Sequence, residues 1–424
     1  METFPKKISE WVEMEHKVQQ ILTEQELHGW YFDEGSAREL ESELRSRLET
    51  VSRTLREKHP FVAGNEFTPR RANKTQGYFD GCPFTRLKDF NPTSRDQIAW
   101  VMKEHYGWKP TMFTDSGKAV IDEVVLKEIG TPIALDFFKM LEITKQLGML
   151  SEGINAWQKL VVNNRIHHHC SVATNTYRCS HRNPNLAQTP ADERFRRLFQ
   201  PTPGLRMVGA DLSGIELRMF SHYLARYDGG SYGEILLNGD IHQVNADRVG
   251  VSRSDCKRIQ YAILYGAGNE KIGLTYDPQL SPKAAKSKGS ELREAFLDAV
   301  EGLQDLVAAL KKKVQSEGHL NSIDGRCVFV DGPHKSLNYL LQSGAGIVAR
   351  RWLLLANKEI KKKNIDAHQL AFVHDELQFE VPPAQANDLM QILEHTARLA
   401  GEFYNLRFPI AAEATTGLSW AETH

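Results

Sequence analysis

Two aspartates stand where a folded chain can bring both carboxylates into one cleft. Asp211 ends the short apolar run 206–210, and Asp375 lies at the turn inside the apolar segment 370–381. Strand ends deliver side chains to the edge of a sheet, where two carboxylates can hold two Mg²⁺ ions about 3.5–4 Å apart. One ion would lower the pKa of an attacking hydroxyl, and the other would stabilise charge on a leaving pyrophosphate.

A cationic helical segment separates the two aspartates along the chain. Arg253, Lys257 and Tyr261 recur at steps of four residues. On a helix each such step turns the side chain by only about 40°, so all three share one face that is about 12 Å long. That length is enough to run beside a triphosphate, a sugar and part of a base. Combined with the two aspartates, this face predicts a two-metal nucleotidyl transferase.

Each of these residues also has an ordinary structural interpretation. Asp211 precedes a helix and could be its N-cap, although Ser213 can fill that role. Asp is a favoured turn residue, yet the flanks of the turn at 374–376 are apolar enough to be buried, and three ionisable groups there are costly without a purpose. Tyr261 could belong to a core stripe, and His242 is a lone histidine. The predicted chemistry therefore rests on the combination rather than on any single residue.

The composition is that of an ordinary globular enzyme. Of 424 residues, 41% are hydrophobic and 25% are charged, which is usual for a soluble protein. No run approaches the roughly 18 apolar residues of a membrane span, and the first residues lack the apolar stretch of a signal peptide. The five cysteines are scattered without a CxxC pair, which argues against a zinc site or a disulfide framework. We therefore expect a protein of the reducing cytoplasm that does not associate with membranes.

The chain is nearly neutral, with 53 basic and 54 acidic residues. This balance argues against a uniformly basic coat for nucleic acid but leaves room for a local basic channel. Short basic clusters occur at 311–313 and 361–363, and each alone is typical of a solvated helix face.

Hydropathy and turn residues predict a helical first third and a mixed remainder. Before residue 158 we expect helix at 8–58, irregular structure at 59–96, a helix start at 94 and helix at 136–147. Beyond it we expect strands at 159–162, 206–210 and 326–331, helices at 253–265, 290–316 and 336–360, and a hairpin at 370–381.

The order of the motifs resembles that of the family A DNA polymerases. Asp211 with Glu216 comes first, Arg-x3-Lys-x3-Tyr-x3-Tyr-Gly follows over 253–266, and His-Asp-Glu stands at 374–376. The likeness is strongest to the replicative polymerases of short-tailed bacteriophages. Four further stretches carry it, namely 236–242, 265–273, 324–326 and 337–343. It covers about 160–424 firmly and 8–158 loosely.

The resemblance implies an α+β fold of the right-hand polymerase type. Such a fold has a helical thumb, an antiparallel-sheet palm and helical fingers. We expect the N-terminal helical region and thumb at 1–157, the palm at 158–240 and 323–424, and the fingers at 241–322.

The resemblance also implies the catalytic residues. Asp211 and Asp375 would be the metal-binding carboxylates, with the Leu212 carbonyl as a further ligand. Glu376 would be a supporting carboxylate beside them. Lys257 would protonate the leaving pyrophosphate.

The implied nucleotide site involves the helical segment and the residue five positions after Asp211. Arg253, Lys257 and His242 would hold the triphosphate. Tyr261 would stack on the incoming sugar and base. Glu216 would be a steric gate whose side chain fills the space that a ribose 2′-hydroxyl needs.

The implied DNA contacts come from several segments. Arg178, Asn338, Gln342 and His374 would touch the primer–template near its terminus, on the minor-groove side. Tyr265 would lie where the templating base enters.

The implied activity is template-directed addition of dNTPs to a primer 3′ end with release of pyrophosphate. We expect two Mg²⁺ ions as cofactors, with Mn²⁺ able to substitute. The expected partners are primer–template DNA, dNTPs and other replication proteins, and we expect a monomer in the cytoplasm, which is the host cytoplasm if the chain is viral.

We expect no 3′–5′ exonuclease in this chain. Such a site in this lineage opens with Asp-x-Glu on a strand. Before residue 158 the candidate pairs are Asp33-Glu34 and Asp122-Glu123. Both pairs are adjacent, so their side chains would diverge on a strand. The segment 26–33 resembles the one that follows the proofreading domain in relatives.

Two short segments need separate comment, a tyrosine where the family has glycine and a run of three histidines. The family usually has Thr-Gly-Arg where this chain has Thr176-Tyr177-Arg178, so a bulky side chain replaces a glycine beside the duplex. The run His167-His168-His169 suggests a metal site at first sight, but neighbouring strand residues point to opposite faces, so a three-ligand site there is disfavoured.

Three other activities compete with this reading. A single-subunit RNA polymerase shares the palm aspartates, but Glu216 and the His-Asp-Glu motif favour DNA synthesis. A catalytically dead scaffold predicts loss of Asp211, Asp375, Arg253 or Lys257, and all are present. A reverse transcriptase would need adjacent aspartates at the hairpin tip. Competition between dNTP and NTP, and primer extension with Mg²⁺, separate these activities.

Overall fold

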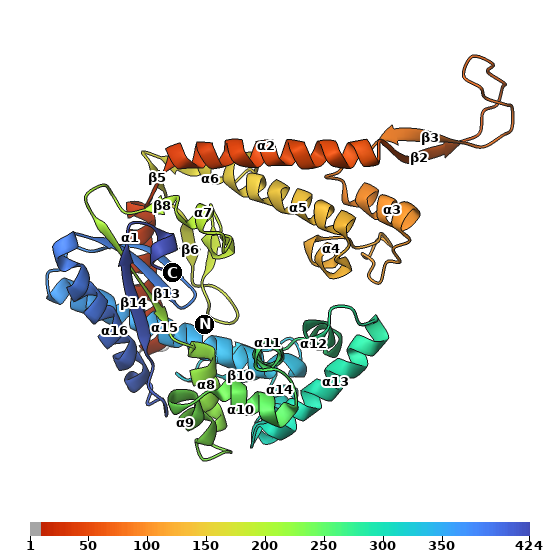
Figure 1. Cartoon of the computed structure of the whole chain (residues 1–424). Helices are drawn as coiled ribbons and strands as arrows, with labels where there is room; N and C mark the ends of the chain where they lie inside the picture. Colours follow the sequence, from red (N-terminus) through yellow and green to blue (C-terminus); the bar gives the residue numbers. More distant parts are fainter. Residues whose placement is uncertain (1–9) are drawn as a thin grey trace, which may run out of the picture. The chain divides into compact units, whose positions relative to one another are not determined.

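The computed structural model describes residues 10–424, which form two compact units. One unit joins Met1–Ser36 with Trp157–His424, and the other is Ala37–Ala156. The predicted subdomain bounds, which keep 1–157 together, stay a prediction. Figure 1 labels the helices and strands of both units.

A four-stranded antiparallel sheet is the centre of the larger unit. Its strands, in spatial order, are β12 (His368–Val373), β13 (Glu376–Val381), β9 (Arg206–Leu212) and β14 (Ala412–Gly417). Every residue of β13 is buried, because helices cover the sheet. α1 (Glu10–His28) packs against β12, and α16 (Ala386–Phe403) packs against β9 and β14. α15 (Ser336–Lys362) packs against both of these helices. The predicted strand at 206–210, helix at 336–360 and hairpin at 370–381 are confirmed.

A layer of helices follows the sheet's first strand along the chain. It comprises α8 (Ile215–Leu224), α9 (Ser231–Asn238), α10 (Ile241–Val249), α11 (Arg253–Leu264), α12 (Asn269–Tyr276), α13 (Pro282–Ala299) and α14 (Leu303–Glu317). α12 and α13 pack closely because a Cβ at Gly289 would come within 1.7 Å of the Asn269 carbonyl oxygen. The prediction of helix throughout 290–316 is wrong. α13 ends at Ala299, where Val300 is extended, and Gly302, with a left-handed φ of 74°, is the N-cap of α14.

A second small sheet pairs the strands β4 (Val161–Val162), β5 (Arg165–Ile166), β1 (Trp30–Phe32) and β8 (Phe199–Gln200). It shows two sequence predictions to be wrong. The helix predicted over 8–58 is interrupted by β1, because Gly29 takes a left-handed φ of 70° and the aromatic rings of β1 are buried against β8. The strand predicted over 159–162 begins as the short helix α6 (Trp157–Leu160), whose Trp157 is fully buried against Phe199.

Two short hairpins, of two strands each, and a helical turn complete the larger unit. They are β6 (His169–Ser171), β7 (Ser180–Arg182), β10 (His319–Asn321), β11 (Cys327–Phe329) and α7 (Glu193–Arg196). The predicted strand at 326–331 corresponds to β11, which is shorter.

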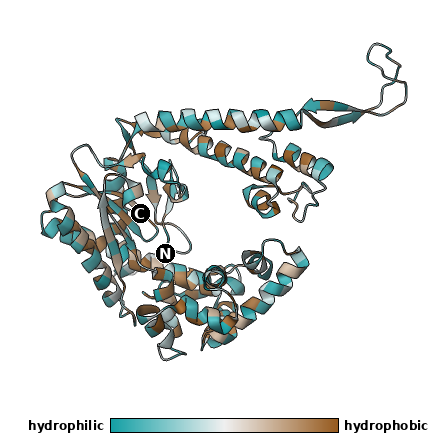
Figure 2. Cartoon of the chain, viewed as in Figure 1, coloured by the Kyte–Doolittle hydropathy of each residue, from teal (hydrophilic) through white to brown (hydrophobic). Residues whose placement is uncertain are grey.

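The smaller unit is mainly helical. It holds most of α2 (Glu34–Lys58), with α3 (Arg95–Tyr106), α4 (Glu123–Ile129) and α5 (Pro132–Leu147). Ser94 is the N-cap residue of α3, and α5 covers the predicted helix at 136–147. α2 is hydrophilic over most of its surface (Figure 2) and buries a stripe that includes Leu40, Leu44 and Leu55.

The irregular structure predicted over 59–96 is wrong in part. Strands β2 (Phe61–Phe67) and β3 (Phe84–Asp89) form an antiparallel hairpin. Its far end is stabilised by aromatic packing, with Tyr78 ring centroids 5.0 Å from both Phe67 and Phe84. Pro69, Gly77 and Gly81 lie in the connection between the two strands. These residues therefore indicate irregular structure in the connection but not in the strands on either side of it.

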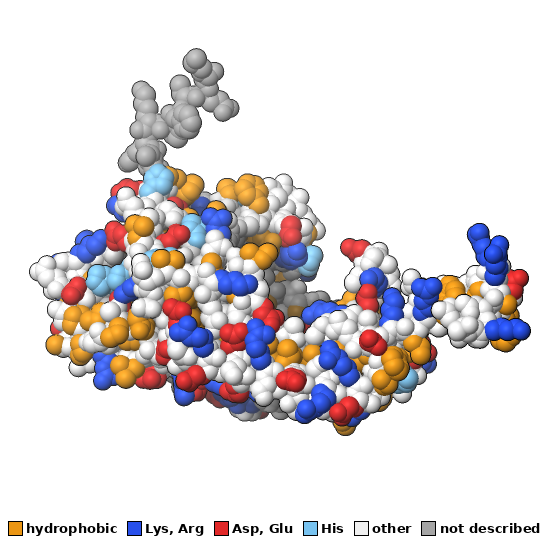
Figure 3. All heavy atoms as spheres, turned by 90° about the horizontal axis from the view of Figure 1, so that it is seen from above, with side chains coloured by type: hydrophobic (Ala, Val, Ile, Leu, Met, Phe, Trp, Pro, Cys, Tyr) orange, Lys and Arg blue, Asp and Glu red, His pale blue; other side chains and the backbone are white. Residues whose placement is uncertain are grey.

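Charged residues of both signs are mixed over the surface. Figure 3 shows basic and acidic side chains interspersed on the face in view, in agreement with the near-neutral net charge. Among the helices of residues 10–424, none has both the length and the apolar character required to cross a bilayer.

A buried carboxylate ties β13 to three other segments of the larger unit. The Glu380 side chain is 1% exposed, and its Oε1 lies 2.6 Å from His28 Nε2 and 3.2 Å from Arg165 Nη2. The Thr202 backbone N–H donates to Oε2 at 2.7 Å. Burial alone would raise the pKa of Glu380, but the hydrogen bonds from His28 and Thr202 and the charge of Arg165 outweigh it and lower the pKa to about 2.

We expect Glu380→Gln to destabilise the fold by about 3 kcal/mol, because Arg165 would lose its buried anion. The folded-state pKa lies below the ordinary value of 4.5, so the carboxylate's contribution is complete above about pH 4.5 and is lost as the pH falls toward 2. Urea unfolding midpoints across that window should drop for the wild type and change less for the variant. Glu291→Gln is the control, since Glu291 is exposed and pairs only with Lys288. Equal midpoints for Glu380→Gln and the control would contradict this expectation.

Candidate active site

Of the two predicted catalytic aspartates, Asp211 lies on β9 and Asp375 lies in the turn that joins β12 to β13. The register pairs Asp211 on β9 with Glu376 on β13, and the Leu212 N–H donates to the Asp375 carbonyl at 3.0 Å. The N-cap interpretation of Asp211 and Ser213 is wrong, because Gly214 caps α8 with a left-handed φ of 57° and no side chain bonds to the helix end. Asp211 is therefore left without a local structural role.

The surroundings of both aspartates raise their pKa values and so disfavour the charged form. Asp211 reaches the surface, yet surrounding protein removes enough water to raise its pKa to about 6, and the nearby Glu376 carboxylate adds to the shift. Burial raises the pKa of Asp375 to about 7, and the charges of Asp211 and Glu216 raise it further. These are the shifts expected of clustered, partly buried carboxylates, and the charge of Arg178 offsets only part of the rise at Asp375.

A divalent cation would supply the missing charge. Within residues 10–424, neither Asp211 nor Asp375 forms an ion pair with a lysine or arginine. Over the same residues, no set of three or more His, Cys, Asp or Glu side chains is arranged to hold a metal. The two carboxylates fit hard cations such as Mg²⁺, which accept one or two carboxylates and take their remaining ligands from substrate phosphates and water.

Glu376 is fixed by contacts that sequence reasoning missed. Its Oε1 accepts hydrogen bonds from Trp420 Nε1 and Gln378 Nε2, both at 2.6 Å, and its Oε2 lies 2.9 Å from His424 Nδ1. Gln378 could have been found, since residues two apart on a strand share a face. Trp420 and His424 carry no signal in the sequence, because only the folded chain brings its last residues to β13.

Glu216 joins residues from three segments. Its Oε1 accepts from Arg178 Nη2 at 2.5 Å and from the Tyr265 hydroxyl at 3.1 Å. Burial raises the pKa of Tyr265 to about 12, and the charge of Glu216 contributes. Burial also raises the pKa of Tyr261, again with a contribution from Glu216. The structure thus brings the predicted gate, both tyrosines and Arg178 together beside Asp375.

α11 presents the predicted cationic face. Ser252 caps it by accepting from the Asp255 N–H at 3.1 Å. Arg253 and Lys257 are exposed, and Arg253 Nε lies 2.6 Å from Asp240 Oδ2. Tyr261 is half-buried, with its ring centroid 6.1 Å from that of Tyr265. An exposed cationic end and a half-buried aromatic end match a ligand that is charged at one end and flat at the other.

His242 lies at the start of α10 beside this face. Its Nδ1 is 3.2 Å from Gln260 Oε1, and Gln260 in turn donates to the buried Tyr232 hydroxyl at 2.6 Å. Burial lowers the pKa of His242, and the nearby charges of Lys257 and Arg253 lower it further. The three residues predicted to hold a triphosphate are therefore near one another.

The predicted DNA contacts fall into two places. Asn338 and Gln342 share one face of α15, where Gln342 Nε2 donates to Asn338 Oδ1 at 2.7 Å. His374 forms the hairpin turn with a left-handed φ of 59°. Burial lowers the pKa of His374, and the charge of Arg178 lowers it further, which places these two side chains together.

The three consecutive histidines do not form a metal site. His167 and His169 both turn toward Glu26, at 2.7 Å from its carbonyl and 2.8 Å from its carboxylate. His168 points the other way and contacts the buried Gln25 at 3.1 Å. This alternation is the one expected of a strand.

Comparison with known proteins decides the family. Residues 82–422 match the family model of DNA polymerase family A. The chain belongs to the family A DNA polymerases. Over its full length the polymerase is 30% identical to the DNA-directed DNA polymerases of Enterobacteria phage T3 and Escherichia phage T7, and it covers 71% of each. The predicted DNA-directed DNA polymerase activity and the phage-like character are confirmed.

A solved structure confirms the fold class. The polymerase matches the POL domain of Pol1 from M. smegmatis, solved with DNA primer–template and dNTP, at a TM-score of 0.79 and 21% identity. The match covers 97% of this chain and 70% of that one. The α+β right-hand architecture predicted from the sequence is thus confirmed.

Proposed function

We propose that the polymerase adds dNTPs to a primer 3′ end by a two-metal-ion mechanism. The observation that carries the proposal is that Asp211 on β9 and Asp375 in the adjoining hairpin turn lie together, where the Leu212 N–H donates to the Asp375 carbonyl. Both have raised pKa values, and within residues 10–424 neither forms an ion pair with a lysine or arginine. These two carboxylates and the Leu212 carbonyl would hold two Mg²⁺ ions, or Mn²⁺ in their place. When bound, the ions would activate the primer hydroxyl and stabilise charge on the leaving pyrophosphate.

The side chains around the aspartates bind and orient the substrates. Arg253, Lys257 and His242 hold the triphosphate along the exposed end of α11, and Lys257 donates a proton to the leaving pyrophosphate. Tyr261 stacks on the incoming sugar and base. Glu376, held by its three hydrogen bonds, keeps a fixed negative charge beside Asp211.

The DNA lies against the remaining predicted contacts. Arg178 and His374 approach the primer terminus, Asn338 and Gln342 contact the minor-groove side, and Tyr265 marks the entry of the templating base. Primer–template DNA and dNTPs are the partners that these contacts require. We further propose that the polymerase acts as a monomer in the cytoplasm beside other replication proteins.

We also propose that residues 10–424 contain no proofreading site. The two acidic pairs considered from the sequence have structural roles, since Asp33 accepts hydrogen bonds from Ser36 and Asp122 caps α4. Incubation of a 3′-mismatched primer–template with Mg²⁺ tests the proposal. Without dNTPs the primer should keep its length, and with dNTPs a matched primer should be extended. Primer shortening that survives Asp211→Ala would reveal a separate exonuclease.

We expect Glu216→Ala to raise the use of NTPs relative to dNTPs by on the order of 10- to 100-fold in kcat/KM. The Glu216 side chain is 14% exposed and held by Arg178 and Tyr265, so its removal opens a defined space for a 2′-hydroxyl. Single-nucleotide insertion with matched dNTP and NTP measures the ratio. Glu234→Ala on α9 is the control, as an exposed glutamate away from this cluster. An unchanged ratio of NTP to dNTP use in Glu216→Ala would contradict the assignment of Glu216 as the steric gate.

A further inference from the structure

The loop between β6 and β7 contains a tyrosine in a backbone conformation that tyrosine rarely adopts. Tyr177 has a left-handed φ of 58°. For a bulky residue this region is unfavourable and persists only where surrounding contacts over-determine it. The family pattern described above has glycine at this position, and glycine adopts such angles freely. The Tyr177 side chain must therefore make contacts that compensate for the backbone.

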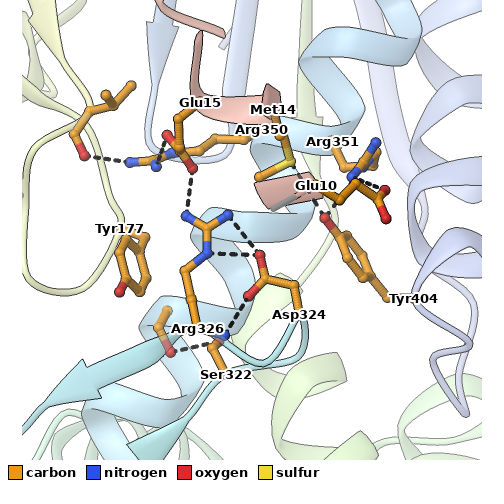
Figure 4. Close-up of polar contacts among 12 residues, drawn as sticks. Glu10, Met14, Glu15, Tyr177, Ser322, Asp324, Arg326, Arg350, Arg351 and Tyr404 are labelled. Carbon is orange, nitrogen blue, oxygen red and sulfur yellow. Dashed lines mark hydrogen bonds and ion pairs between the residues drawn. The ribbon is translucent and has the colours of Figure 1, made fainter. Parts of the chain in front are cut away.

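Those contacts hold Tyr177 on two sides. Its hydroxyl donates to the Cys327 carbonyl on β11. Its ring lies against two guanidinium groups, with the Arg326 and Arg350 Cζ atoms 4.7 and 5.9 Å from the ring centroid. Figure 4 shows these arginines gathered around Glu15 next to Tyr177. Arginine over an aromatic face is attractive, and more so when both groups are desolvated.

The two arginines are themselves rigid. Their side chains are 2% and 1% exposed, and both pair with Glu15 on α1, with Arg326 Nη1 at 2.5 Å from Glu15 Oε1. Arg326 also pairs with Asp324 at 2.7 Å, and Arg350 Nη2 donates to the Val172 carbonyl at 2.8 Å. Tyr177 is thus anchored to a buried network that joins α1, α15 and the β10–β11 hairpin.

The loop backbone packs directly on α15. A Cβ at Gly346 would come within 2.5 Å of the Tyr177 carbonyl oxygen and 3.3 Å of the Arg178 nitrogen. The next side chain along, Arg178, reaches Glu216 at 2.5 Å. Any shift of the Tyr177 backbone therefore moves the origin of the Arg178 side chain.

We propose that Tyr177 is a positioning residue, which anchors the β6–β7 loop so that Arg178 is held against Glu216, the proposed sugar gate. The inference rests on the proposed roles of Arg178 and Glu216. A side-chain anchor in this polymerase replaces the freely adopted glycine conformation of the family pattern, and it fixes Arg178 more tightly than the backbone alone would. Misplacement of a substrate-positioning group raises KM and weakens discrimination.

Tyr177→Gly and Tyr177→Phe test the inference in the chain of 424 residues. Glycine keeps the left-handed φ without strain but removes the anchor, and phenylalanine removes only the hydroxyl. In single-turnover insertion, Tyr177→Gly should raise KM for dNTP by about fivefold, the effect of one net hydrogen bond. It should also lower the preference for dNTP over NTP, with a smaller change in kcat. Tyr177→Phe should shift both quantities in the same direction by less.

A double-variant cycle separates positioning from general stability. Tyr177→Gly should add nothing further to KM or sugar preference in an Arg178→Ala background. Tyr404→Phe is the matched control, because Tyr404 also contacts an arginine of this region, Arg351, but lies apart from the loop. It should leave both quantities unchanged.

The outcomes distinguish this inference from the proposed function. Additive effects of Tyr177→Gly and Arg178→Ala would overturn the positioning role while leaving Arg178 in the site. A lowered melting temperature with unchanged KM and sugar preference in Tyr177→Gly and Tyr177→Phe would overturn it as well. If Arg178→Ala alone changes neither quantity, Arg178 does not act on nucleotide selection through Glu216, and the role of Tyr177 fails even if Arg178 contacts the DNA.

Discussion

Asp211→Asn and Asp375→Asn should each reduce primer extension by at least about 10³-fold, which corresponds to roughly 4 kcal/mol of barrier. Within the described residues the two aspartates form no ion pair with a lysine or arginine. Each substitution removes a negative charge from them, so the attraction for divalent cations falls while the shape of the site is kept. Asp211→Asn also relieves part of the repulsion that raises the pKa of Asp375. The folded sheet should therefore be unharmed or slightly stabilised.

The measurement is single-turnover extension of a primed template with Mg²⁺, together with the affinity for the same DNA. Affinity should stay within a few-fold of the wild type, because phosphate contacts elsewhere dominate DNA binding. Glu413→Gln is a demanding control, since Glu413 on β14 pairs in register with Asp211 but is not among the predicted ligands. Robust synthesis by either aspartate variant, or an equal loss in Glu413→Gln, would rule out the assignment.

Lys257→Ala should lower the rate of nucleotide addition at saturating dNTP by about 10²- to 10⁴-fold, the range of general acid catalysis. Lys257 is exposed on α11 one turn from Arg253 and beside His242, so it can reach a triphosphate without rearrangement of the helix. Lys257→Arg should keep much of the binding, because it keeps the positive charge, but it should lose most of the rate, because a guanidinium does not release its proton.

Rapid-quench kinetics over a range of dNTP concentrations separates the two effects for Lys257. The Arg variant should have a KM near that of the wild type and a strongly reduced kcat, whereas the Ala variant should be altered in both. Arg258→Ala is the control from the same helix, because Arg258 pairs with Asp255 on another face. If Lys257→Ala changes KM alone, Lys257 binds phosphate but does not act as the acid.

Much of the candidate site could be predicted because its signals are local. Residues four apart on α11 share a face in any context, so Arg253, Lys257 and Tyr261 needed no tertiary information. The apolar strands around Asp375 specify a buried hairpin by their own hydropathy, and the structure bears this out over 368–381. The predicted secondary structure was wrong where a few residues have more influence than the overall hydropathy pattern of their segment. Gly29 and Gly302 interrupt predicted helices, and aromatic packing stabilises the β2–β3 hairpin.

Only the tertiary structure decided how distant segments meet. Glu216 accepts hydrogen bonds from Arg178 and Tyr265, which lie 38 and 49 residues away along the chain, and no periodicity encodes such a meeting. Glu376 is likewise held by Trp420 and His424, which contact it only because the last residues of the sequence fold back onto β13. The sequence by itself determined the chemistry, since residue types and short spacings carry it. The folded chain determined which side chains hold the reactive groups in place, since that depends on packing between segments that are remote in sequence.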